Sequence, residues 1–316
     1  IVFITHKLHE ILEIADRVSV LRQGRVVGSG RPDSFSEADL AELMVGRPVS
    51  FSVERSTART GDAVLRLNDV TLVDRTLESS LTAIDLTVRE GEVVGIAGVQ
   101  GNGQTELVEV ITGLATASSG SIEFSGADIT RASVRARHSL GIAHIPEDRH
   151  KSGMVGAFTV AENIVLNSYY DSSVTNGVQI DWQRVRNRAA RACVNYDVRT
   201  PSVQLAAGSL SGGNQQKMVV ARELEREVKL IVASQPTRGV DVGSIEYIHK
   251  QLIACRDGGN AVLIISSELD EILDLSDRIY VMFEGRIVAE FDNSNRNADR
   301  GAIGLAMAGV AEGGAA

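Results

Sequence analysis

The sequence predicts an α/β fold in which parallel strands lie buried between helices. Uninterrupted apolar runs, such as VLII at residues 262–265, are typical of parallel strands whose two faces are both covered. Some of these runs lead through a glycine-rich turn into a segment with helical spacing, as at residues 93–112, which is how strand–helix units of α/β proteins are built. The opening of the chain also returns near its end, which indicates a repeated α/β unit.

The repeat joins residues 1–27 to residues 262–288, which align without gaps at an offset of 261 residues. The shared pattern is a strand, a turn, a helix, a strand, a tight turn and a second strand. The identities include Ile4/Ile265, Leu8/Leu269, Glu10/Glu271, Asp16/Asp277, Arg17/Arg278, Gly24/Gly285 and Arg25/Arg286. An offset of this length is the size of a domain rather than of a solenoid repeat, so we expect a tandem duplication.

This duplication divides the chain into four parts. We expect the remnant of a first domain at residues 1–46, a linker at 47–62, a complete second domain at 63–309 and a disordered tail at 310–316. The linker is polar and has no clear periodicity. The first residues, IVFITH, look like the middle of a strand and include no initiating Met, so we expect the sequence to belong to a longer one.

Composition narrows the classes of function. The chain has 32 basic and 41 acidic side chains and a formal charge of −9, which argues against a phosphate-neutralising surface for bulk nucleic acid. Its two cysteines, Cys193 and Cys255, are too few and too far apart for a disulfide framework or a zinc site. No apolar run reaches the length of about 18 residues that a membrane span needs.

The elements of the second domain are predicted in chain order from residue 63. Residues 63–72 alternate apolar and polar side chains as a strand does, and residues 84–97 contain two strands about a Glu90-Gly91 turn. A glycine-rich turn at residues 98–105 then leads into the helical segment ELVEVITGL. Such a turn can cradle a phosphate, because glycines let backbone N–H groups approach an anion at the positive end of the helix.

The glycine-rich turn fits the phosphate-loop pattern G-x-x-x-x-G-K-[ST] at three positions. Gly98, Gly103 and Thr105 match this pattern, whereas Gln104 occupies the position of the lysine. Taken alone, the match is weak, and an ordinary strand-to-helix turn explains it equally well.

A second motif, LSGGNQQK at residues 210–217, precedes a helical segment. A Ser-Gly-Gly turn at a helix start can present N–H groups and a hydroxyl to an anion, or it can be a plain helix cap.

A third motif, LIVASQPTRGVD at residues 230–241, ends an apolar strand in Ser234 and Gln235 and continues into a proline-bearing loop. Nucleotide hydrolases place a metal-holding carboxylate and a base at this point of the fold.

The order of these motifs resembles the ATP-binding cassette ATPases of ABC transporters, and the resemblance covers essentially the whole chain. LSGGNQQK is similar to the signature motif of the branch with two fused cassettes, which imports simple sugars or nucleosides. The resemblance implies a P-loop NTPase fold, with a RecA-like mixed sheet flanked by helices, an antiparallel β subdomain and an α-helical signature subdomain at about residues 147–222. It places residues 98–105 at the Walker A loop, residues 230–241 at Walker B and the D-loop, and Glu147 at the Q-loop.

The resemblance also implies the contacts with nucleotide. Fifteen positions match the family's nucleotide-binding residues: Gly98, Gly101, Asn102, Gly103, Gln104, Thr105, Glu147, Leu210, Ser211, Gly212, Gly213, Asn214, Gln215, Ser234 and Asp241. The expected catalytic positions are His6, the switch histidine of the first cassette, with Gln235 and Ser267 in the second. ATP and Mg²⁺ are the implied cofactors, and Thr105 is the expected Mg²⁺ ligand.

Several positions of the second cassette depart from the family pattern. Gln104 replaces the lysine that offsets phosphate charge, Ser234 replaces the Asp that holds Mg²⁺, and Gln235 replaces the catalytic Glu. Ser267 replaces the switch histidine, and no aromatic residue lies between residues 62 and 91 to stack on adenine. We therefore expect a degenerate nucleotide site in this cassette.

The signature has a different status, because Ser211–Gly213 are intact. In the family, the signature of one cassette serves the nucleotide site of the other. We expect this signature and His6 to complete a competent site in the first cassette, whose Walker motifs lie outside the sequence. The alternative for His6, a strand-end histidine satisfied by backbone groups, stays open.

The implied function is the ATP-binding and ATP-hydrolysing subunit of an importer for a simple sugar or a nucleoside. Its partners would be integral membrane permease subunits, which dock near residues 147–158, and indirectly a solute-binding protein. The cassettes would pair head to tail within the full-length chain, peripherally on the cytoplasmic face of the membrane. These 316 residues alone would have little or no activity.

Two other classes of function stay open. A soluble tandem-cassette ATPase acting on ribosomes or DNA usually keeps both Walker motifs and carries basic insertions or long charged linkers, which this sequence lacks. The third class is a non-catalytic nucleotide-binding or interaction module.

Overall fold

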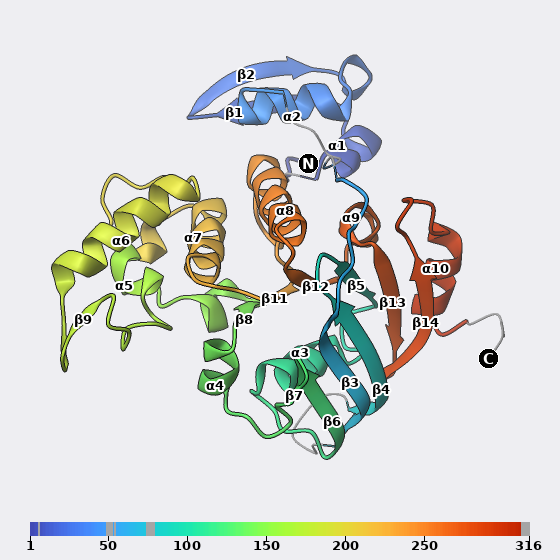
Figure 1. Ribbon diagram of the computed structural model, residues 1–316. Coiled ribbons are helices and arrows are strands. Elements are labelled where there is room, and N and C mark those ends of the chain that lie inside the picture. The colour runs from blue at the N-terminus through green and yellow to red at the C-terminus, as the bar shows by residue number, and fades with distance from the viewer. Residues whose placement is uncertain (6, 49–52, 54, 74–79, 311–316) are drawn as a thin grey trace.

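A six-stranded sheet lies at the centre of the computed structural model, which describes residues 1–5, 7–48, 53, 55–73 and 80–310 (Figure 1). The strand order is β14-β13-β5-β12-β11-β8. Five of these strands are parallel, and β14 runs antiparallel to β13 at the edge. The strands are β5 (Val93–Ala97), β8 (Ile142–Ile145), β11 (Leu230–Ser234), β12 (Ala261–Ser266), β13 (Arg278–Phe283) and β14 (Arg286–Asp292).

Every residue of β5, β11 and β12 is buried, as their uninterrupted apolar sequences predict. Successive side chains of a strand point to opposite faces of the sheet. In β5, Val93 and Ala97 belong to one hydrophobic cluster, whereas Val94 and Ile96 belong to the other. The sheet therefore separates two cores.

The second core lies against a four-stranded antiparallel sheet with the order β4-β3-β6-β7. Its strands are β3 (Ala63–Leu72), β4 (Leu81–Arg89), β6 (Ser119–Phe124) and β7 (Ala127–Asp128). Helix α3 (Gln104–Thr112) packs into the same core through Leu107, Val108, Val110 and Ile111. The predicted fold, a mixed sheet with flanking helices and an antiparallel β subdomain, is confirmed.

Helices dominate the segment between β8 and β11 (Figure 1). The elements here are η2 (Arg149–Gly153), α5 (Val160–Ile164), the short strands β9 (Thr175–Asn176) and β10 (Gln179–Ile180), α6 (Trp182–Asn195), η3 (Ala207–Ser209) and α7 (Gly212–Leu224). Helix α4 (Val134–Ser139) precedes β8.

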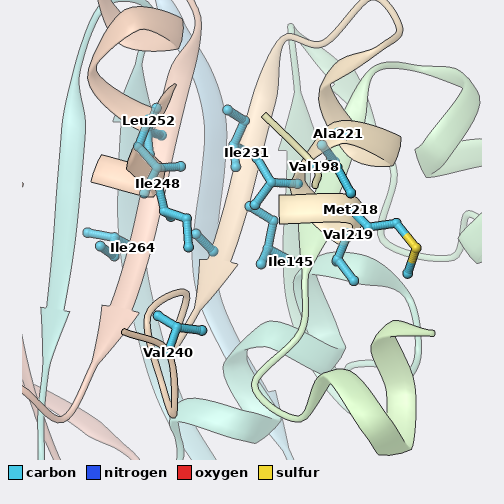
Figure 2. Packing of buried hydrophobic residues seen from close by; sticks show 14 of the residues in the cluster. Ile145, Val198, Met218, Val219, Ala221, Ile231, Val240, Ile248, Leu252 and Ile264 are labelled. Carbon is cyan, nitrogen blue, oxygen red and sulfur yellow. The ribbon is translucent and has the colours of Figure 1, made fainter. Parts of the chain in front are cut away.

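Figure 2 shows how this segment joins the first core. Met218 and Val219 of α7 lie on the side of the sheet formed by β8 and β11, in the same cluster as Ile145 and Ile231. Ile248 belongs to the same cluster and lies on α8 (Val242–Asp257). Fully burying such side chains contributes on the order of 1.5–3 kcal/mol each, so the sheet positions α7 and α8 relative to each other.

The N-terminal unit, which we define as residues 7–47, has a small core of its own. It contains α1 (Leu8–Ile14), β1 (Val18–Arg22), β2 (Arg25–Gly30), η1 (Pro32–Ser34) and α2 (Glu37–Val45). Leu8, Val18, Val20 and Leu40 form this core, and Val242 of α8 completes it.

The C-terminal elements repeat this order of elements. There α9 (Leu269–Leu275) is followed by β13, β14 and α10 (Arg300–Met307). Both hairpins have a β-bulge at the same step, after Val20 in one and after Val281 in the other. Both turn through two residues of positive φ, at positions 23–24 and 284–285. The two copies of the sequence repeat therefore have the same local fold.

Residues 1–5 differ from their counterparts, and the strand expected there is wrong. They form no strand, and Ile1, Val2 and Ile4 are almost fully exposed. The counterpart residues 262–266 lie in β12, hydrogen-bonded on one side to β5 and on the other to β11. A strand needs such neighbours to pair its backbone groups, and residues 1–5 have none among the described residues.

None of the helices in the described part of the chain combines the length and the apolar character needed to cross a bilayer.

Candidate nucleotide site

The motif residues gather where the parallel strands end. Strand β5 leads into the 98–103 loop, β8 into Pro146 and Glu147, β11 into Gln235, and β12 into Ser267. Carboxyl ends of parallel strands meet at one edge of a sheet, where open α/β proteins bind their ligands.

The 98–103 loop has the backbone of a phosphate cradle. Gly101 and Gly103 have φ values of 93° and 100°, which glycine adopts without strain. The loop is held against the β13–β14 turn, because Gly285 N donates to Asn102 O at 3.0 Å and Glu284 N donates to Asn102 Oδ1 at 3.2 Å. Thr105 is exposed in the first turn of α3.

The side chain of Gln104 folds back into this loop. Its Nε2 donates to Val99 O at 2.9 Å, and its Oε1 accepts from Asn102 N at 3.1 Å. A Cβ placed on Gly98 would lie 2.3 Å from Gln104 Nε2, so the amide fills the hollow beside Gly98. One loop N–H is thus engaged within the protein, and the amide brings no positive charge to a phosphate.

Gln235 and Ser267 lie side by side at the ends of β11 and β12. Ser267 Oγ donates to Gln235 Oε1 at 3.3 Å, and Gln235 N donates to Ile265 O at 2.7 Å. Ser234 is buried at the last position of β11. A glutamine amide can orient a water molecule but cannot accept its proton, so this pair lacks a general base.

Glu147 is held between the phosphate-loop side and the D-loop side of the site. Its carboxylate accepts a hydrogen bond from Gln100 Nε2 at 3.4 Å and forms an ion pair with Arg238.

Arg149 joins the same region to the signature helix. Its guanidinium donates to Arg238 O at 2.9 Å, to Gly239 O at 3.2 Å and to Gln215 Oε1 at 3.3 Å. Burial lowers the pKa of Arg149, and the neighbouring Asp148 opposes this shift.

The signature turn is packed tightly against the start of α8. Asp241 caps α8 by accepting from Ser244 N at 3.0 Å and from Ser244 Oγ at 2.9 Å. A Cβ on Gly213 would lie 2.1 Å from Ser244 Oγ and 2.6 Å from Asp241 Oδ2, so only glycine fits at this position.

The polar side chains of the signature bond locally. Asn214 Nδ2 donates to Ser211 Oγ at 3.0 Å, while Gln215 Nε2 donates to Ala207 O at 3.3 Å. Ser211 is exposed, and Leu210 is half-buried beside the first core.

Comparisons with known proteins agree with this geometry. The family model described as "ABC transporter" matches residues 81–238, which is half of the chain. The chain belongs to the ABC transporter family. The resemblance predicted from the motifs is confirmed, and its pairing with a first cassette stays a prediction.

Three curated relatives of this ABC transporter chain are named as import ATP-binding proteins. It is 47% identical over 287 residues to the nucleoside import ATP-binding protein NupA of Lactococcus lactis, covering 91% of this chain and 57% of that protein. It is 46% identical to the glucose import ATP-binding protein TsgD13 of Haloferax volcanii, covering 98% and 56%. It is also 46% identical to the guanosine import ATP-binding protein NupO of Bacillus subtilis, covering 94% and 58%. The chain thus spans just over half the length of these relatives.

Solved structures confirm the cassette fold. A nucleotide-free ATP-binding cassette from an ABC transporter aligns with a TM-score of 0.63 at 25% identity, covering 78% of this chain and 99% of that chain. A second ATP-binding cassette of an ABC transporter aligns with a TM-score of 0.65 at 24% identity, covering 79% and 99%.

The ABC transporter chain brings the predicted residues together in two groups. The first group lies at the carboxyl ends of the parallel strands. It contains residues 98–105, Glu147, Gln235 and Ser267. The second group is the signature turn with Asp241. Hydrogen bonds connect the two groups indirectly, through Glu147, Arg238 and Arg149. His6 lies outside the described residues.

Sequence reasoning missed Arg149 and Arg238 as members of the site. Both lie within motifs already singled out, IPEDR and QPTRG, and each is the one cation of its motif. That signal could have found them, although their partners are up to 91 residues away in the sequence.

The residues of this site do not fit Mg²⁺. Mg²⁺ prefers carboxylate oxygens, but β11 ends in Ser234 and Gln235. Within the described residues, no group of three or more His, Cys, Asp or Glu side chains is placed to hold a metal ion. Thr105 supplies one hydroxyl near the loop.

Proposed function

We propose that this chain is part of the energising ATPase subunit of an importer for a simple sugar or a nucleoside. The names of three relatives, each at least 46% identical, describe nucleoside, glucose and guanosine import ATP-binding proteins. Because the chain spans just over half of each, ATP hydrolysis and import are proposed for the full-length protein.

We infer further that the cassette at residues 63–309 has a degenerate nucleotide site. The observation that carries this inference is Gln104, whose amide fills the hollow beside Gly98. The Gln235–Ser267 pair supports it, because neither side chain can act as a general base.

The signature of this cassette serves the nucleotide site of a first cassette, in which residues 1–46 and His6 take part. Support comes from the state of the signature turn. Its glycines pack closely against Asp241, Ser244 and Arg149, while Ser211 is exposed. Helix α7 therefore starts at a surface, where its N–H groups can meet an anion from another unit.

Mutagenesis of the full-length protein tests this division of roles. Gln104→Ala and Gln235→Ala are expected to leave the rate of ATP hydrolysis within about twofold of wild type, because neither residue takes part in hydrolysis. Ser211→Arg is expected to lower kcat by at least tenfold, because its bulk and charge fill the signature turn. The decisive measurement is steady-state phosphate release with the permease present. A large loss in Gln104→Ala, or full activity in Ser211→Arg, contradicts the proposal.

The permease partner is proposed to dock beside residues 147–158. Val155 and Phe158 in this segment are 37% and 43% exposed. A cavity of about 330 Å³ lies next to it, lined by Pro146, Ser152 and Leu166 among others. An apolar surface of this kind fits a helix end of an integral membrane protein, which would bring the chain to the cytoplasmic face of the membrane, with a solute-binding protein on the other side.

Docking is tested by co-purification with the permease. Phe158→Glu is expected to reduce the permease recovered with the protein, whereas Val178→Glu, at a fully exposed position of the β9–β10 turn, is the matched control. Equal recovery in both variants would favour a soluble, non-transport ATPase or an interaction module.

A further inference from the structure

Two positions that correspond in the repeat are in contact with each other. Lys7 Nζ lies 3.7 Å from Glu268 Oε1, and the two residues are 261 positions apart, which is the offset of the repeat. Lys7 precedes α1 and Glu268 precedes α9, in nearly the same backbone conformation (φ −81°, ψ 103° and φ −85°, ψ 104°). In Figure 1, α1 lies beside α9.

Contact between counterparts has a geometric meaning. When a rotation relates two copies of a unit, a residue can touch its own counterpart only close to the rotation axis. If a two-fold rotation relates the N-terminal unit to residues 268–307, which we call the C-terminal unit, its axis passes between these two side chains. Around a two-fold axis, such a contact is the self-complementary centre of the interface.

The N-terminal unit contacts α8 through close packing and ion pairs. Val45 of α2 packs so closely on α8 that a Cβ on Gly243 would lie 3.2 Å from its Cγ1. Arg47 Nη1 lies 2.8 Å from Glu246 Oε2, and Glu246 is only 5% exposed. Lys250 pairs with the same carboxylate at 2.6 Å.

The charges at the axis have opposite signs in the two copies. A pair of identical units would bring Glu268 against Glu268, or Lys7 against Lys7. Like charges placed opposite each other are repulsive, and proteins use such repulsion to exclude wrong partners. Only the unlike pair brings a lysine to a glutamate.

We propose that the Lys7–Glu268 pair selects the partner of this surface: the starts of α8 and α9 accept the N-terminal unit of the same chain and disfavour a second copy of the C-terminal unit. This inference rests on the proposed tandem arrangement and names the feature that makes it asymmetric. The pair is therefore a specificity determinant for cassette pairing. Both side chains are more than half exposed, so their effect is modest and depends on salt.

A double-mutant cycle on this chain tests the proposal. The variants are Lys7→Glu, Glu268→Lys and the charge-swapped double variant. The readout is the hydrogen-exchange rate of peptides covering residues 37–47 and 242–250, whose contact opens when the N-terminal unit leaves. At low salt, each single variant is expected to exchange about 1.5- to 5-fold faster, the range for exposed ion pairs. The double variant is expected to return towards the wild-type rate, and 1 M NaCl to remove the differences.

Lys7 also lies 3.6 Å from Glu10 on its own helix, and the cycle cancels this contribution because Glu10 is present in all four proteins. Asp270→Lys is the matched control, since Asp270 lies on α9 but pairs with Arg300. It is expected to leave exchange at residues 242–250 unchanged. The proposal would be overturned if the increase in exchange rate in the double variant equalled the product of the increases in the two single variants. No nucleotide is involved, so this result is independent of the test of the degenerate site.

Discussion

Gln104 shows how one side chain can change the use of a loop without changing its backbone. The loop keeps the glycine conformations of a phosphate cradle, but the amide satisfies Asn102 N and Val99 O within the protein. A lysine at the same position would project a positive charge towards the loop instead.

Gln104→Lys is therefore expected to tighten the binding of a nucleoside triphosphate to this chain by about tenfold, since charge-assisted hydrogen bonds contribute about 1.5–3 kcal/mol. Isothermal titration calorimetry measures this change. Hydrolysis is not expected to appear, because Ser234 and Gln235 are unchanged. Identical nucleotide affinities in wild type and Gln104→Lys would show that something other than the Gln104 amide keeps nucleotide out of the loop.

Gly213 offers a second prediction for a single residue. A methyl group there would meet Ser244 Oγ at 2.1 Å, so Gly213→Ala must displace the start of α7 or α8. Overpacking of this kind typically costs about 1–3 kcal/mol, which urea denaturation measures.

Gly304→Ala is the matched control for Gly213→Ala. A Cβ on Gly304, within α10, meets nothing within 4 Å, and alanine favours helices by about 1 kcal/mol over glycine. If Gly213→Ala stabilised the protein as much as Gly304→Ala does, the packing argument would be wrong.

His144 of strand β8 lies against helix α7, and this packing predicts a pH dependence. Burial, which Glu223 opposes and Arg222 reinforces, lowers the pKa of His144 to about 4. Its Nε2 is buried and has no hydrogen-bond partner among the described residues. The unfolded chain takes up the proton near pH 6.5, so stability is full above that pH and falls as the pH drops towards 4.

The free energy of unfolding is expected to be about 2 kcal/mol lower at pH 5 than at pH 7 through this residue. In His144→Gln, that part of the pH dependence should disappear, whereas in His150→Gln, at an exposed position, it should remain. Urea denaturation at the two pH values gives the comparison, and equal slopes in wild type and His144→Gln would contradict it.

Regular elements were predictable where one short-range pattern determined them. Strand β3 spans residues 63–72 as its alternation predicts, and α9 follows from the helical spacing in the repeat. The ion pair of Glu147 with Arg238 could not be predicted, because it depends on how β8 and β11 bring two loops together. The strand expected at residues 1–5 was wrong for the related reason that sheet formation depends on neighbours and not only on apolar sequence.

At the scale of the whole molecule, the residues that the structure describes form three hydrophobic clusters. The smallest is the one that joins the N-terminal unit to α8. Because this junction is small and partly ionic, it is expected to open before the sheet unfolds. The charge of Glu246 belongs to this junction. Burial raises the pKa of Glu246, but Lys250 and Arg47 more than offset that effect, so the net shift is downward.

Val45→Asp tests this separation. It sets a carboxylate against Gly243, close to Asp241, so the N-terminal unit should leave α8 while the main sheet stays folded. Hydrogen exchange should rise by at least tenfold in residues 37–47 and change little in β11 and β12. Equal acceleration in both regions would mean that the chain unfolds as one unit.

The shared bulge of the two hairpins bears on ancestry and on engineering. Side chains have diverged between the copies, so that Met282 stands opposite Leu21 in the alignment, yet the register slips at the same step in both. The backbone bulge has therefore been kept in both copies although the side chains around it differ. The β1–β2 hairpin should accordingly be able to replace the β13–β14 hairpin, and the reverse exchange should also work. Each hairpin can therefore serve as a template for redesigning the other.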